Sequence, residues 1–124
     1  MEKLTLIDEM TKIEYEFPTW LIKIKIGREN KKNGLVIPDR EYRDSLDDTQ
    51  KEIFDTFAKQ ISRESSFIIY QEKNAKKIAV PDCSGPVFLN NELIPTNIKH
   101  LLKNNNNNLR IGDGYLMKIK IGSG

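Results

Sequence analysis

The sequence has little of the chemistry on which metalloproteins and disulfide-rich proteins depend. Among its 124 residues there is one cysteine, Cys83, and one histidine, His100. A single cysteine excludes a disulfide within the chain, and one Cys with one His cannot supply the four ligands of an ordinary structural zinc site. We expect Cys83 to be an inert thiol in a turn and His100 to be a surface residue rather than a catalyst.

Long apolar runs and an excess of one charge are also missing. No stretch approaches the roughly 20 apolar residues of a membrane helix, and no signal peptide opens the sequence. Lys and Arg number 20 against 18 Asp and Glu, and aromatic residues make up 8%. Proteins that coat nucleic acid usually carry a strong basic excess, and surfaces that stack on single-stranded bases are rich in aromatic residues. We therefore predict a cytoplasmic protein with no membrane insertion and no nucleic-acid partner.

Known catalytic motifs are absent from the sequence. It contains no phosphate-cradling glycine-rich loop followed by Lys and Ser or Thr, no nucleophile elbow and no metal-ligand cluster. The adjacent carboxylates of Asp47 and Asp48 suit the start of a helix better than an acid–base pair. We predict that the protein is not an enzyme and needs no cofactor. Its length fits one domain, large enough for a hydrophobic core without covalent staples.

Alternation of apolar and charged residues indicates that most of the chain is strand. In residues 117–121, for example, Met117, Ile119 and Ile121 alternate with two lysines, the period of a half-buried strand. Residues 67–70 are apolar on both faces, which predicts a central strand. Strands are predicted over residues 4–7, 12–17, 21–26, 35–37, 67–70, 78–80, 87–89, 109–111 and 117–121. Many short strands separated by turn residues favour an all-β fold, a two-sheet sandwich or barrel.

Two segments depart from this pattern. Residues 45–60 predict one amphipathic helix, with Ser45 and Asp48 resembling a capping box. Apolar residues recur there at i, i+4 spacing, as on one face of a helix: Ile53, Phe54, Phe57, Ala58 and Ile61. Residues 104–108 are five asparagines, a residue that suits turns more than strands or helices. They predict a solvated loop.

Short motifs in a particular order carry a resemblance to a known family. Gly27-Arg28 comes first, Ser62-Arg63 follows the predicted helix, and residues 82–91 and 109–113 close the series. Together they resemble the forkhead-associated (FHA) domain, whose pattern runs Gly-Arg, Ser-Arg-x-His, Asn-Gly-Thr-Phe-Val-Asn-Gly and Leu-x-x-Gly-Asp. The resemblance covers essentially the whole chain. It implies an FHA-like β-sandwich over residues 1–122, with 123–124 as a linker stub.

The resemblance also implies a function and a set of site residues. FHA domains bind phosphothreonine peptides through loops at one end of the sandwich. A phosphate offers about two negative charges and three strong acceptors, which the planar fork of arginine matches with parallel hydrogen bonds. The positions that correspond to phosphopeptide-binding residues are Arg28, Ser62, Arg63, Ser84 and Asn90. The expected partner is a phosphothreonine-containing protein or peptide, with a larger parent chain or assembly as a further possibility.

The sequence departs from the family pattern at several positions. Ser65 replaces the family histidine, and Gly85-Pro86-Val87 replaces Asn-Gly-Thr, whose asparagine holds the peptide backbone in the family. Asn90-Asn91 replaces the second Asn-Gly and still supports a tight turn, since asparagine tolerates positive φ. The segment 45–60 is an insertion that either extends the recognition surface or lies over it. The alternative function is a phosphate-independent scaffold or assembly domain.

Overall fold

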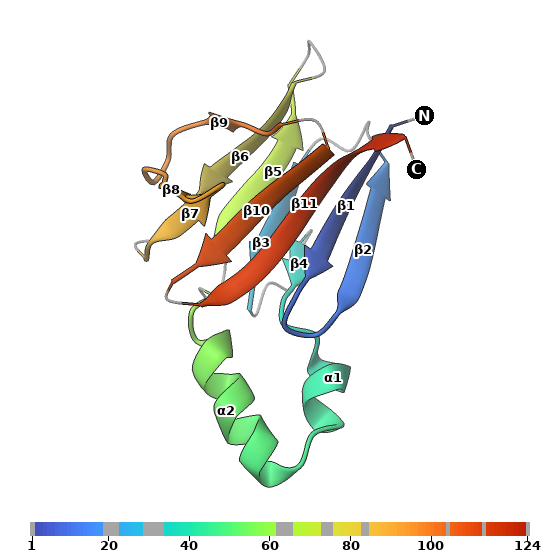
Figure 1. Cartoon of the computed structure of the whole chain (residues 1–124), viewed down its shortest axis with the longest axis vertical. Coiled ribbons are helices and arrows are strands. Elements are labelled where there is room, and N and C mark those ends of the chain that lie inside the picture. Colours follow the sequence, from blue (N-terminus) through green and yellow to red (C-terminus); the bar gives the residue numbers. More distant parts are fainter. Residues whose placement is uncertain are drawn as a thin grey trace.

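A computed structural model describes residues 2–18, 23–28, 34–61, 66–72, 76–82, 85–103, 105–112 and 114–123. Two β-sheets face each other, and a pair of helices projects from one end of them (Figure 1). The N- and C-terminal ends of the chain lie at the opposite end of the sheets (Figure 1). The predicted two-sheet, all-β sandwich is confirmed.

The first sheet has six strands and is antiparallel throughout. Its strands, in spatial order, are β2 (Ile13–Pro18), β1 (Glu2–Asp8), β11 (Tyr115–Ser123), β10 (Asn105–Ile111), β7 (Val87–Leu89) and β8 (Glu92–Leu93). The last strand continues to Ser123, which pairs with Glu2.

The second sheet has five strands, with β5 at its centre as the apolar pattern predicts. In spatial order they are β4 (Gly34–Val36), β3 (Lys23–Gly27), β5 (Phe67–Gln71), β6 (Lys77–Pro81) and β9 (His100–Leu101). The pair β3–β4 is parallel and the others are antiparallel. The two-residue strands β8 and β9 have no counterpart among the predicted strands.

The core lies between the sheets and is made of alternate residues from both. In β3, Ile24 and Ile26 are buried while Lys23 and Lys25 are exposed. The same alternation in β11 buries Met117, Ile119 and Ile121. Each such side chain contributes about 1.5–3 kcal/mol by leaving water. The period of two therefore fixes which face of each strand enters the sandwich.

The insertion between β4 and β5 contains two helices: the helix predicted over about residues 45–60 is α2 (Asp48–Ala58), and the short α1 (Arg40–Asp44) before it was not predicted. The capping box uses Asp47 and Gln50: the Gln50 amide donates to Asp47 Oδ1 at 2.7 Å, and the Asp47 amide donates to Gln50 Oε1 at 3.3 Å. Ser45 caps the end of α1 instead.

Of the two apolar faces that the i, i+4 spacing identifies in α2, only one is buried. Phe54 and Ala58 are buried, whereas Ile53 is 58% exposed and Phe57 is 37% exposed. The ring of Phe54 packs against Tyr42 of α1, with centroids 5.5 Å apart. The i, i+4 pattern identifies two candidate faces, and packing against α1 selects the one through Phe54.

The asparagine run is not a loop, because β10 begins at Asn105 and includes four of its residues. The Asn107 side chain is fully buried. Its Oδ1 accepts from the Lys103 amide at 2.9 Å, and its Nδ2 donates to the Lys103 carbonyl at 2.8 Å. An amide side chain can satisfy both backbone groups of a neighbouring residue. Asn107 thereby occupies an inward position that usually holds an apolar residue.

Neither helix has the length and apolar character that a membrane span requires, and this holds for every helix in the described ranges.

Candidate functional site

The helical insertion and the end of β3 share one end of the sandwich. β3 ends at Gly27, whose carbonyl accepts from the Ile37 amide at 3.1 Å. The Ser66 amide donates to the Ile26 carbonyl at 2.8 Å, and the Asp82 amide donates to the Ser66 carbonyl at 2.9 Å. These backbone bonds hold the end of β3, the entry to β5 and the exit from β6 side by side.

Three predicted phosphopeptide ligands, Ser62, Arg63 and Ser84, lie outside the described residues, as do Ser65 and Cys83. The described residues that flank 62–65, Ile61 and Ser66, are both fully buried. The Ser66 amide bonds to the carbonyl of Ile26, two residues before Arg28.

Arg28 follows β3 directly, at the end where the helices project. The residue is half-buried. Its Nε is buried and has no hydrogen-bond partner within the described structure. Leaving a charged donor unpaired away from water is costly, so such groups are normally bonded. An acceptor from a bound molecule would satisfy this atom.

A cavity of about 290 Å³ separates Arg28 from the two helices. That volume is at the lower limit of small-molecule sites, about 300–1,000 Å³. The lining combines four cationic, two acidic and three apolar residues: Arg28, Arg40, Arg43, Lys59, Asp39, Asp55, Pro38, Phe54 and Ala58. We call this cavity the insertion pocket.

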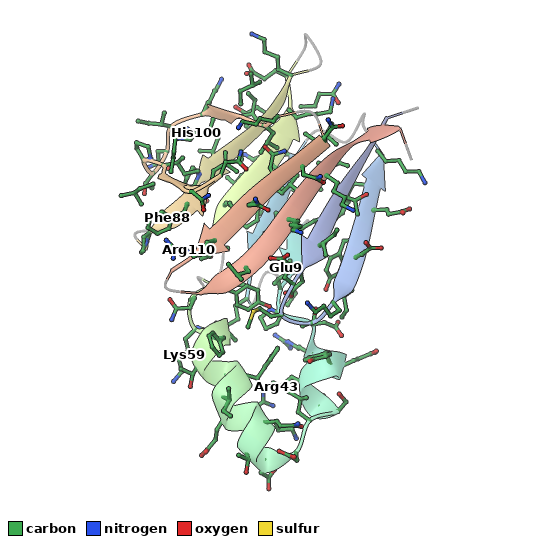
Figure 2. The ribbon with its side chains drawn as sticks, in the orientation of Figure 1. Glu9, Arg43, Lys59, Phe88, His100 and Arg110 are labelled. Carbon is green, nitrogen blue, oxygen red and sulfur yellow. The ribbon has the colours of Figure 1, made fainter. Side chains whose placement is uncertain are left out.

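Both carboxylates of the insertion pocket have partners. Arg43 Nε donates to Asp55 Oδ1 at 2.7 Å, and Arg43 Nη2 donates to Asp55 Oδ2 at 2.8 Å. These hydrogen bonds hold the pKa of Asp55 below its usual value. Asp39 is the N-cap of α1, where its Oδ2 accepts from the Tyr42 amide at 3.1 Å. Figure 2 shows Arg43 between the two helices.

Within the described residues, the other cations of the pocket lack a carboxylate partner of the kind that Arg43 has. Arg40 and Lys59 are exposed, and neither forms an ion pair with a described carboxylate. Lys59 follows the last turn of α2, at the end of this helix nearest the sheets (Figure 2). With Arg28 they leave the pocket with a net positive charge.

The C-terminal end of α2 is held against the β10–β11 turn. The ring of Phe57 lies over Gly114, with Cε1 3.6 Å from the place a Cβ would take. Gly112 has φ +62, and a Cβ there would overlap the Gln60 side chain. The positive φ favours glycine at 112, and a larger residue there would also have to displace the Gln60 side chain. These contacts fix the pocket wall relative to Arg28.

A buried Asp–Tyr pair stiffens the same end of the sandwich. Tyr115 donates its hydroxyl hydrogen to Asp8 Oδ2 at 2.7 Å, and both side chains are fully buried. Burial raises the pKa of Asp8, although hydrogen bonds from Tyr115 and Met10 oppose this. Burial also raises the pKa of Tyr115. Sequence analysis missed the pair, because only the pairing of β1 with β11 brings the two residues together.

Asn90 lies in the β7–β8 turn. Its side-chain Oδ1 accepts from the Asn108 amide at 2.9 Å. Asn90 and Asn91 have φ +51 and +69, which confirms the predicted tight turn. The three residues of β7 lie between Pro86 and Asn90, a span of roughly 13 Å along the strand. The contact of Asn90 with a peptide stays a prediction.

His100 lies on β9, far from the helices (Figure 2), and is half-buried rather than fully on the surface. No cluster of metal-ligating side chains is found in the described part of the chain.

Comparisons with known proteins show which solved structures share this architecture. No family model matches the sequence and no curated protein matches it. Solved structures do match: an FHA domain of an Arabidopsis thaliana hypothetical protein has a TM-score of 0.66 at 15% identity, over 100% of this chain and 89% of that one. The N-terminal FHA domain of Saccharomyces cerevisiae Rad53p, in complex with a phosphothreonine peptide, has a TM-score of 0.66 at 12% identity, over 98% and 94%.

A third match is the FHA domain of the Chlamydia trachomatis CT664 protein, with a TM-score of 0.60 at 11% identity over 99% of this chain and 97% of that one. The chain therefore has the FHA fold over its full length, as the ordered motifs predict.

Proposed function

We propose that this protein is a protein-interaction module that reads phosphothreonine in a cytoplasmic signalling partner. Arg28 is the principal phosphate ligand, and Ser62, Arg63, Ser84 and Asn90 are the further predicted contacts. The observation that carries the proposal is the buried, unpaired Nε of Arg28 at the loop end of an FHA fold. A domain with this fold, from Rad53p, was solved with a phosphothreonine peptide.

The chemistry of Arg28 suits this role. The phosphate of phosphothreonine carries about −1.5 to −2 charges and three acceptor oxygens. Arginine donates two parallel hydrogen bonds to such a group, and its charge does not depend on pH in the physiological range. Each charge-assisted hydrogen bond contributes about 1.5–3 kcal/mol. Loss of the Arg28 fork is therefore expected to weaken binding by one to several orders of magnitude.

The test is an array of phosphothreonine peptides with varied flanking residues, followed by calorimetry on the best binder. We expect binding to need the phosphate and to fall at least tenfold in Arg28→Ala. Arg28→Lys, which keeps the charge without the fork, should lie between the two. Lys120→Ala is the matched control, because Lys120 is exposed near the end of β11 that is remote from the helices (Figure 1). Equal binding of phosphorylated and unphosphorylated peptides would contradict the proposal.

A phosphate-independent assembly domain is the second candidate. The exposed face of α2 favours it, because Ile53 is 58% exposed on a helix that projects from the sandwich (Figure 1). Partner capture that survives Arg28→Ala and fails in Ile53→Asp would support this function over phosphate reading. Capture that fails in Arg28→Ala and survives in Ile53→Asp would exclude it.

A further inference from the structure

We propose that the insertion pocket binds a second anionic group of the same phosphopeptide, either a phosphorylated residue or a carboxylate side chain. The inference rests on the proposed function and adds a specificity subsite to it. Arg28 lines the pocket and is also the proposed phosphothreonine ligand. A group in the pocket would therefore lie next to the phosphothreonine, on the side of the helical insertion.

The charges of the pocket favour an anion. Its two carboxylates already serve other groups: Asp55 neutralises Arg43 through two hydrogen bonds, and Asp39 caps α1. Arg28 and Arg40, with Lys59 from the end of α2, form no ion pair with a described carboxylate. Three cations around one cavity repel each other unless an anion lies between them.

The shape of the pocket fits a side chain with a polar tip. Pro38, Phe54 and Ala58 supply an apolar part of the wall, and the cationic groups supply the rest. A glutamate or a phosphorylated residue has an apolar stem and an anionic end, which matches such a lining. The volume of about 290 Å³ holds more than one phosphate group, so the stem can enter with its charge.

The pocket wall is organised before any ligand binds. The bidentate Arg43–Asp55 ion pair joins α1 to α2, and the Tyr42–Phe54 ring contact does the same on the buried side. Phe57 holds α2 against Gly114 of the sandwich. A preformed wall lowers the ordering cost of binding. The insertion therefore extends the recognition surface. The sequence alone also allowed the insertion to lie over that surface.

The experiment uses the best singly phosphorylated peptide and a series derived from it. At each position within four residues of the phosphothreonine, one series carries glutamate, a second carries another phosphothreonine and a third carries alanine. We expect at least one position where an anionic group raises affinity three- to tenfold at 0.15 M salt. The gain should shrink at 1 M salt, where the screening length falls from about 8 to about 3 Å. The two anionic series distinguish a carboxylate from a phosphate as the preferred group.

The protein variants show which residues produce this gain in affinity. The double variant Arg40→Ala, Lys59→Ala should lose the gain while keeping its affinity for the singly phosphorylated peptide within about twofold. Both side chains are exposed, so the variant is expected to fold. Arg28→Ala should weaken every phosphopeptide, and Lys120→Ala should change nothing.

Three results would overturn the inference. An anionic group that gives no gain at any position shows that the pocket is not an anion subsite. A gain that persists in the double variant places the subsite elsewhere. A double variant that loses the singly phosphorylated peptide as well makes the pocket part of the primary site. In each of these cases, the proposed function still holds if the wild type binds peptide only when it is phosphorylated. If the wild type shows no phosphate-dependent binding, both the proposed function and the subsite are contradicted.

Discussion

Gly85 occupies the position where the FHA pattern has the asparagine that holds the peptide backbone. A Cβ added at Gly85 would meet no atom within 4 Å, and its φ lies outside the left-handed region. A side chain is therefore accommodated there without strain. We expect Gly85→Asn to fold normally and to raise phosphopeptide affinity two- to tenfold, since one net hydrogen bond contributes about 0.5–1.5 kcal/mol.

The matched control for this change is Gly85→Ala, which adds the Cβ without the amide. Calorimetry of both variants with one phosphothreonine peptide separates the amide from the loss of backbone freedom. An affinity of Gly85→Asn no higher than that of Gly85→Ala would show that the peptide does not pass along this loop.

Asp8 makes stability depend on pH in the direction opposite to an ordinary ion-paired carboxylate. Its pKa is raised in the folded protein by burial, so the fold favours the protonated form and the unfolded chain releases the proton more easily. The contribution of Asp8 to the free energy of unfolding is therefore largest below the ordinary carboxyl pKa, about 3.9. It falls as the pH rises from that value through the raised folded pKa.

Asp8→Asn removes this titration while keeping a polar partner for Tyr115. Urea unfolding at a series of pH values measures the free energy of unfolding of both proteins. As the pH rises, the value for Asp8→Asn should increase relative to that of the wild type. Asp82→Asn, at an exposed carboxylate, is the control. A difference that does not change with pH would show that burial does not perturb Asp8.

At the scale of elements, the insertion is stabilised mainly by Phe54. Its ring packs on Tyr42 and is buried, although the helices meet the sheets at one end only. Phe→Ala changes in protein cores cost about 3–5 kcal/mol. We expect Phe54→Ala to open α1 and α2 locally and to leave the sandwich folded, because the main core does not include this ring.

Hydrogen exchange followed by NMR measures this effect directly. Amides of α1 and α2 should lose at least tenfold in protection, while those of β5 and β11 keep theirs. Ile53→Ala, next in sequence and largely exposed, should change neither set. Loss of protection throughout the sandwich would mean that the insertion and the sheets unfold as one unit.

The elements also differ in how far the sequence predicts them. The strands are predicted well, because alternating isoleucine and lysine reports directly which face is buried. The helix boundaries are predicted less well, since Asp39, Asp47 and Ser45 all suit helix ends and only the packing of Tyr42 on Phe54 decides between them. The strand in the asparagine run depends on bonds between Asn107 and Lys103 that no local pattern reveals.

At the scale of the whole molecule, the sandwich brings together segments that are far apart in sequence. Ordered motifs such as Gly27-Arg28 predict the fold and the functional end. Sequence motifs do not predict the insertion pocket, because its lining comes from the end of β3, the start of α1 and the last turns of α2. Its charge depends on which carboxylates are already bonded, and that is a property of the folded chain.

The whole-molecule account predicts that ligand binding is confined to the end of the sandwich that carries the insertion. Figure 1 shows that this end is opposite both termini, which leaves the recognition surface accessible. The strand β9 with His100 lies far from the helices (Figure 2).

The measurement that tests this claim most directly is an NMR titration of the wild-type protein with the best phosphothreonine peptide, followed through its backbone amides and the Nε–H signals of its arginines. The account predicts the largest changes at Gly27 and at the Arg28 Nε–H, with no comparable change for the unphosphorylated peptide. Phosphate-dependent changes centred on β8 and β9, with the Arg28 Nε–H unmoved, would contradict it.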